Sequence, residues 1–315
     1  MRQVIDEWVK TQPDIEFEGQ FVPQDDYWTK VQTMVASGAP PDAGIADYGR
    51  LVSYAANGTL LPISEYLKAA SFPLDKMFPG ATAQYRWTKG EFDSGNASGE
   101  YFGIPSDGQS QIFVYNKKMF DDAGVAYPTD DWTWDDMLAA AKTITKPDEN
   151  KWGIAGISNY ILLKGNYVFA AGGAIHNADF SKSMLADPGT VEAYKWNWDL
   201  IFTHKVAPPP GSLTSTNPFM TGQVAMYIEG VWWIPDFVAG IKDFDWDVAM
   251  FPKHPGTGKR TTTVESDGWW IYKGSKEPEA TYRLIEALAL PEGQKKFGEL
   301  NYIVPSNIPE IAEIW

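Results

Sequence analysis

The sequence predicts an α/β fold, and two observations support this prediction. Helical and strand patterns alternate near the start, with apolar residues at helical spacing in 4–9 and 28–35 and a short buried-strand pattern in 43–46. Such an alternation favours parallel strands that are covered by helices. The length of 315 residues exceeds what one hydrophobic core usually serves, so we expect two lobes.

The predicted elements follow in chain order and are bounded by capping signals. Asn116 is a favourable N-cap and Gly124 a favourable end for the helix between them, and Thr133 with Asp136 forms a capping-box pattern. Helices are expected at 4–9, 25–36, 51–56, 117–123, 134–142, 188–202, 278–288 and 293–300. Strands are expected at 15–18, 43–46, 101–105, 112–115, 223–228, 245–250 and 269–272.

The stretch 218–235 gives the strongest indication of a binding site. Gly222 suits the left-handed end of a helical turn, and 223–228 is a continuous apolar run that is typical of a strand buried on both faces. In open α/β sheets, ligands bind just beyond the carboxyl ends of such strands. We therefore expect the residues that follow this strand to face a ligand.

The residues beyond this strand suit a polar ring compound such as a sugar. They are Glu229, Gly230, Trp232 and Trp233. A carboxylate accepts hydrogen bonds from hydroxyl groups, and an indole covers the apolar C–H face of a sugar ring. Because adjacent residues that leave a strand point to opposite sides, we expect one indole to pack in the core and Trp232 to be exposed.

Composition and charge exclude several classes of protein. The net charge of −15 argues against a nucleic-acid partner, whose phosphates require basic surfaces, and no run of about 18 apolar residues suggests a membrane span. The absence of cysteine excludes disulfides and thiol chemistry. The first ten residues have no apolar run and do not form a signal peptide, so either the protein is cytosolic or the chain starts after a removed leader.

The sequence predicts no enzyme, no metal site and no cofactor. His176, His204 and His254 lack metal-ligand spacing and are expected at the surface, and no phosphate loop or nucleophile motif is present. The acidic pairs lie at helix ends or turns, where carboxylates cap helices. Glycoside hydrolysis needs two carboxylates across a cleft, and Glu229 with Asp107 or Asp267 is the pair to consider for it.

Several short motifs, taken in order, resemble one known family. The chain is similar to the extracellular solute-binding proteins of ABC sugar importers, the maltose-binding-protein-like family, from Met1 to about Pro309. The motifs that carry this resemblance are 27–38 leading to 41–42, Gly103-Ile104-Pro105, Tyr115-Asn116-Lys117, Thr133-Trp134-Asp135, 219–230 with Trp232, and Gly268-Trp269 followed by 273–275. The family normally has a strand before the first helix and further helices at the end, so the chain looks shortened at both ends.

The resemblance implies a fold and a function. The fold would be periplasmic-binding-protein-like, with two α/β lobes, hinge crossovers and a central ligand cleft; lobe one would comprise 1–107 and 263–302, and lobe two 108–262 and 303–315. The protein would be an extracellular or periplasmic monomer, membrane-anchored if its leader is lipidated, that binds a mono- or oligosaccharide and delivers it to an ABC importer permease. A glycan hydrolase and a binding protein for a non-sugar solute remain the alternatives.

The resemblance also places candidate ligand-binding residues at strand ends and crossovers. Those expected from the first lobe and its crossovers are Asp47, Tyr48, Ser106, Asp107, Gln109, Asp267, Gly268 and Trp269. Those expected from the second lobe are Asn159, Asn166, Glu229 and Trp232, the last at the position of the family's stacking aromatic residue.

Overall fold

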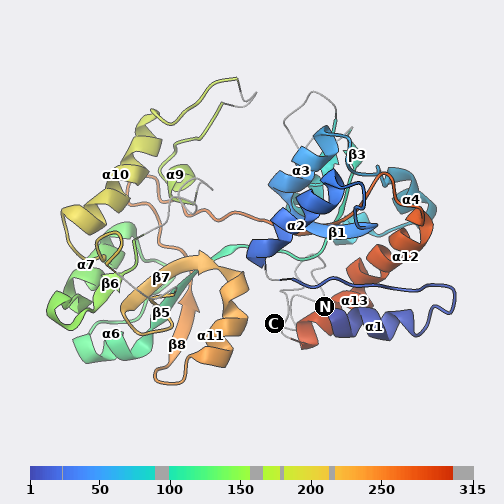
Figure 1. Cartoon of the computed structure of the whole chain (residues 1–315). Helices are drawn as coiled ribbons and strands as arrows, with labels where there is room; N and C mark the ends of the chain where they lie inside the picture. The colour runs from blue at the N-terminus through green and yellow to red at the C-terminus, as the bar shows by residue number, and fades with distance from the viewer. Residues whose placement is uncertain (23, 89–98, 157–165, 178–180, 213–216, 301–315) are drawn as a thin grey trace. The chain divides into compact units, whose positions relative to one another are not determined.

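A computed structural model of the chain describes residues 1–300 except 23, 89–98, 157–165, 178–180 and 213–216 (Figure 1). The chain divides into two compact units: unit 1 comprises Met1–Gln109 and Val264–Trp315, and unit 2 comprises Ser110–Thr263. The expected assignment of 303–315 to the second lobe lies outside the described residues.

Unit 1 is built on a three-stranded sheet in the order β1-β9-β4, with β1 at Ala43–Asp47, β9 at Asp267–Ile271 and β4 at Ile104–Pro105. Both pairings are antiparallel, so the prediction of parallel strands is wrong for this sheet. Local patterns could not show these directions, because β9 comes from the far end of the chain and lies between two strands that come much earlier.

Alternate residues of β9 face two separate cores. Trp269 and Ile271 pack with residues of α1 (Arg2–Val9), α12 (Pro278–Ala289) and α13 (Pro291–Glu299), which lie side by side in Figure 1. Trp270 packs on the opposite face with residues of α3 (Tyr48–Ala56). Adjacent strand residues point to opposite faces, so these two adjacent tryptophans serve two different cores.

Short elements complete unit 1. They are α2 (Gln24–Ala36), α4 (Ser64–Ala69), η1 (Leu74–Lys76), α5 (Pro79–Ala83), and the paired strands β2 (Arg86–Trp87) and β3 (Glu100–Tyr101). The strand predicted at 15–18 is absent. Phe17 packs against the core there, but no described strand pairs with this segment, and apolar alternation without backbone pairing does not make a strand.

Unit 2 contains a four-stranded sheet in the order β6-β7-β5-β8. The strands are β6 (Trp152–Ile154), β7 (Val224–Gly230), β5 (Gln111–Asn116) and β8 (Trp246–Ala249). The pair β6–β7 is parallel, whereas β5 is antiparallel to both of its neighbours. The predicted apolar strand at 223–228 is therefore an interior strand, as its continuous burial requires.

Helices cover both faces of the sheet of unit 2, and alternate side chains of β5 pack against helices on the two faces. Phe113 and Tyr115 pack with residues of α6 (Lys117–Ala123), α7 (Trp134–Ile144) and α10 (Pro188–Phe202), while Ile112 and Val114 pack with α11 (Ile234–Gly240). Figure 1 shows α6 and α7 on one side of this sheet and α11 on the other. The remaining described helices of the unit are η2 (Pro147–Glu149), α9 (Asn166–Ala170) and η3 (Val231–Trp233).

The local capping signals are confirmed. Asn116 Oδ1 accepts a hydrogen bond from the Met119 amide at 3.1 Å, and Gly124 ends α6 with a φ of +66°. Thr133 and Asp136 form the predicted capping box of α7. Gly222 has a φ of +67°, the left-handed conformation that its position before the strand predicts.

The prediction that all three histidines lie at the surface is wrong for His254. His176 is exposed and His204 half-buried, but His254 is only 4% exposed. Its ring meets Trp134 edge to face, with ring centroids 4.5 Å apart. The polar loop sequence around His254 concealed this burial, because the covering residues come from α7 and α10.

No helix of the described part of the chain is both long enough and apolar enough to cross a membrane.

Candidate functional site

The strand ends of unit 1 bring two candidate carboxylates together. Asp47 and Asp267 lie directly opposite each other in the antiparallel pairing of β1 with β9. Asp47 also caps α3, because its Oδ1 accepts a hydrogen bond from the Arg50 amide at 3.0 Å, and its carboxylate forms an ion pair with the Arg50 guanidinium. Tyr48, expected in a loop, is instead the first residue of α3 and is partly exposed.

Three crossover candidates are hydrogen-bonded to the segment that enters β9. The amide and the hydroxyl of Ser106 both donate to the carbonyl oxygen of Asp267, at 2.7 and 2.9 Å. The Asp267 amide donates to Asp107 Oδ1 at 2.9 Å, and Gln109 Nε2 donates to Asp107 Oδ2, also at 2.9 Å. The backbone of Gln109 pairs in both directions with Glu265. Segments 106–109 and 265–267 are therefore joined by a continuous set of hydrogen bonds.

Asp107 has an unusual protonation state. Burial, and after it the nearby charge of Asp267, raise the pKa of its carboxyl group to about 8, against the opposing effect of its hydrogen bonds. At neutral pH the protonated form is therefore substantially populated. In that form Gln109 can turn its side-chain amide and accept the carboxyl proton, which keeps both oxygens of Asp107 hydrogen-bonded.

Gly268 and Trp269 are buried in the interior of unit 1. A Cβ atom on Gly268 would lie 2.1 Å from the ring of Tyr85, so glycine is required there by close packing. Trp269 packs among residues of α12 and α13, and its Nε1 has no hydrogen-bond partner within the described residues. Both positions support the strand that presents Asp267.

Unit 2 places Glu229 and Trp232 at the end of β7. Glu229 is half-buried, and its Oε2 accepts a hydrogen bond from the Gly230 amide at 3.0 Å. A Cβ atom on Gly230 would lie 2.1 Å from the six-membered ring of Trp232, so the indole lies directly against the backbone of this glycine. Trp233 packs inward and stacks on Phe237, with ring centroids 6.2 Å apart and planes at 14°.

Asn166 lies close to the same strands. It begins α9 and is buried, and its Nδ2 donates to Gln111 Oε1 at 3.2 Å. Gln111 pairs with Gly230 across β5 and β7, which links Asn166 to the end of β7 that carries Glu229. Asn166 Oδ1 has no hydrogen-bond partner among the described residues, and Asn159 lies outside them.

Other buried polar residues, which the sequence analysis did not select, are hydrogen-bonded to segments 106–109 and 265–267. Gln294 Nε2 donates to the carbonyl oxygens of Ser106 and Leu288, both at 3.0 Å, and Tyr85 Oη donates to the Ser266 carbonyl at 2.6 Å. Burial raises the pKa of Tyr85 well above its ordinary value, so this phenol stays protonated. A polar residue next to an apolar strand pattern, such as Gln111 directly before 112–115, is the signal that could have identified such positions.

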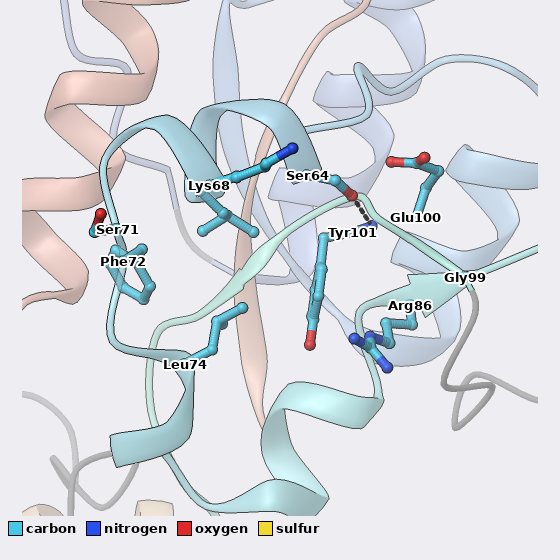
Figure 2. A pocket seen from close by; sticks show the side chains of 10 residues that line it. Ser64, Lys68, Ser71, Phe72, Leu74, Arg86, Gly99, Glu100 and Tyr101 are labelled. Atoms are coloured by element: carbon cyan, nitrogen blue, oxygen red, sulfur yellow. Dashed lines mark hydrogen bonds between the residues drawn. The ribbon is translucent and has the colours of Figure 1, made fainter.

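A separate pocket of about 400 Å³ lies elsewhere on unit 1 (Figure 2). Figure 2 shows Lys68 and Ser64 from α4 facing it, together with Arg86 and Tyr101 from the paired strands β2 and β3. Its lining includes none of the ligand-binding residues predicted from the sequence.

The chemistry of both strand-end groups is that of hydrogen bonding to a polar ligand. Carboxylates at Asp47, Asp267 and Glu229 accept hydrogen bonds, and the indole of Trp232 offers an apolar ring face. Within the described residues, no three histidine or acidic side chains gather in a way that would hold a metal ion.

An α/β fold of two compact units, with polar side chains at the strand ends of each, defines a class of ligand-binding proteins. The chain belongs to the bacterial extracellular solute-binding protein family, whose model matches residues 1–295. The expected two-lobed solute-binding fold and the family resemblance are thereby confirmed. Members of this family are substrate-binding transport proteins rather than enzymes.

Solved structures and a sequence relative agree with this assignment. An ABC substrate-binding protein from Listeria monocytogenes, in complex with cycloalternan, is 29% identical with a TM-score of 0.88, covering 100% of this chain and 78% of that one. An ABC transporter solute-binding protein from Thermotoga lettingae, bound with α-D-tagatose, is 25% identical with a TM-score of 0.83, covering 99% of this chain and 78% of that one. A binding protein of Brucella abortus is 24% identical over 304 residues, which are 95% of this chain and 70% of the relative.

Proposed function

We propose that the protein binds a carbohydrate outside the cell or in the periplasm and delivers it to the permease of an ABC importer. The pairing of Asp47 with Asp267 at adjacent strand ends carries this proposal, because two carboxylates side by side are suited to the vicinal hydroxyl groups of a sugar. The two similar solved structures with bound cycloalternan and α-D-tagatose support the same class of ligand.

In this proposal the ligand-binding side chains are the ones that are at least partly exposed, together with buried Asn166, whose Oδ1 has no hydrogen-bond partner among the described residues. Asp47, Tyr48 and Asp267 of unit 1 would bind hydroxyl groups, and Trp232 of unit 2 would stack on a sugar ring, with Glu229 and Asn166 binding hydroxyl groups beside it. The remaining candidates would have a structural role. Ser106, Asp107, Gln109, Gly268 and Trp269 hold the segment that presents Asp267.

The proposal also covers the mode of action. The protein would act as a monomer, without catalysis and without a nucleic-acid partner, and a lipid anchor on a leader would keep it at the membrane. Solute binding would favour one conformational state of the protein, and the permease would recognise that state.

A melting-temperature screen tests the proposal. Monosaccharides, including tagatose, and linear and cyclic oligosaccharides are compared with polyamines and short peptides. A bound sugar raises the melting temperature by an amount that depends on its concentration relative to Kd. Asp267→Asn should reduce this rise, whereas Asp75→Asn, which changes an exposed carboxylate of the same unit, should not.

Two outcomes of the screen would contradict the proposal. Stabilisation by polyamines or peptides alone would favour the non-sugar alternative. Cleavage of a stabilising sugar during long incubation with the pure protein would favour a glycan hydrolase.

A further inference from the structure

The buried histidine of unit 2 has a hydrogen-bonding pattern that defines its tautomer. Nδ1 of His254 accepts two backbone hydrogen bonds, from Gly256 at 3.1 Å and from Thr257 at 3.0 Å. A nitrogen that accepts from two N–H groups carries no proton, so the proton of the neutral ring is on Nε2. Nε2 lies 3.0 Å from Oε1 of Glu192 in α10, the acceptor that this tautomer requires.

The turn that His254 organises is anchored on two helices. The backbone closes the turn through His254 N to Lys259 O at 2.8 Å and Gly258 N to His254 O at 2.9 Å. The ring then joins the turn to α7 through Trp134 and to α10 through Glu192. Backbone hydrogen bonds of Lys253 with Trp132 and Trp134 hold the start of the turn, and the histidine side chain adds contacts to α7 and α10.

The same loop holds both ends of α9. The hydroxyl of Thr257 donates to the carbonyl oxygen of Ala170 at 2.6 Å, at the last residue of the helix. The hydroxyl of Thr261 donates to the carbonyl oxygen of Asn166, at the first residue. Tyr167, Val168 and Ala170 of this helix pack in the core of unit 2, and the two hydrogen bonds fix the ends of the helix there.

We propose that His254, with Nδ1 unprotonated, is a positioning residue, which fixes the 254–261 loop and through it the two ends of α9 and Asn166. The consequence for solute binding rests on the proposed function, because it requires Asn166 to contact the solute.

Two substitutions test separately the Nδ1 acceptor of His254 and the packing of its ring. His254→Asn places a side-chain oxygen near the position of Nδ1, where it accepts from the second and third following amides as asparagine does in turns. His254→Phe keeps a ring against Trp134 and removes the acceptor. The full chain is used in each case.

The first measurement is hydrogen exchange of the Ala171 and Gly173 amides, which donate to Tyr167 and Val168 of α9. After correction for intrinsic rates, their protection in His254→Phe should fall about tenfold below that of the unsubstituted protein, because the two hydrogen bonds to Nδ1 are lost. His254→Asn should retain the protection of the unsubstituted protein. Should the phenylalanine variant fail to fold, loss of protection in His254→Asn would still contradict the proposal.

A second measurement reads the tautomer directly. Long-range nitrogen–proton NMR spectra at about pH 8 should show the proton of His254 on Nε2. A proton on Nδ1, or full α9 protection in His254→Phe, would overturn the proposal. Both measurements need no ligand, so they stand even if the protein does not bind a carbohydrate.

Discussion

The carboxyl group of Asp107 accepts a hydrogen bond from the amide of Asp267, a residue 160 positions further along the chain, at 2.9 Å. This contact joins the end of β4 to the start of β9 inside unit 1. Asp107, a residue expected to bind ligand, therefore uses both carboxyl oxygens in hydrogen bonds inside unit 1. Asp267 lies at the strand end, opposite Asp47.

The raised pKa of Asp107 predicts a specific pH dependence of stability. Between about pH 4 and about pH 8 the folded state retains a proton that the unfolded state has lost, so the free energy of unfolding falls as pH rises, by up to about 1.4 kcal/mol per unit. Asp107→Asn removes this contribution. Chemical denaturation at about pH 5 and about pH 7 should show the flatter profile in the variant. Parallel profiles for the two proteins would show that Asp107 is ionised in the folded state.

Substitution of Asp47 should separate helix capping from solute binding. Asp47→Ala removes the acceptor for the Arg50 amide and should cost about 1 kcal/mol of stability. Asp47→Asn keeps a capping oxygen and should change stability by less than about 1 kcal/mol, since the lost ion pair with Arg50 is partly exposed. Both variants should bind the carbohydrate found in the screen more weakly. Full affinity in Asp47→Asn would mean that this residue only caps the helix.

Trp232→Ala should weaken carbohydrate binding by about 2–4 kcal/mol, because aromatic anchors contribute at this level. The matched control is Trp233→Ala, which removes an indole that stacks on Phe237 and should act on stability instead. Titration calorimetry gives the affinities, and denaturation gives the stabilities. An unchanged dissociation constant in Trp232→Ala would place the stacking surface on another residue.

Two tryptophans of α10 should differ in their contribution to stability. Trp196 stacks on Tyr167 with centroids 5.3 Å apart and lies 4.9 Å from Trp134, so Trp196→Ala should cost about 3 kcal/mol. Trp198 is 60% exposed, and Trp198→Ala should change stability by less than about 0.5 kcal/mol. Equal losses in denaturation experiments would show that the exposed indole is also part of the fold.

The sequence by itself determined the features that depend on neighbours along the chain. The caps at Asn116 and Thr133 and the left-handed glycines at 124 and 222 follow from contacts within a few residues, and the continuous apolar run at 223–228 predicted an interior strand. The resemblance of ordered motifs also identified the family, because those motifs lie at the ends of such elements.

Only the tertiary structure decided which residues meet across large separations. In unit 1, β9 lies between β1 and β4, antiparallel to both, and its first residue bonds to buried Asp107; in unit 2, α7 and α10 cover His254. The physical reason is that burial and pKa depend on what covers a side chain. For Asp107 and His254 the covering residues come from distant parts of the chain, and no local pattern records them.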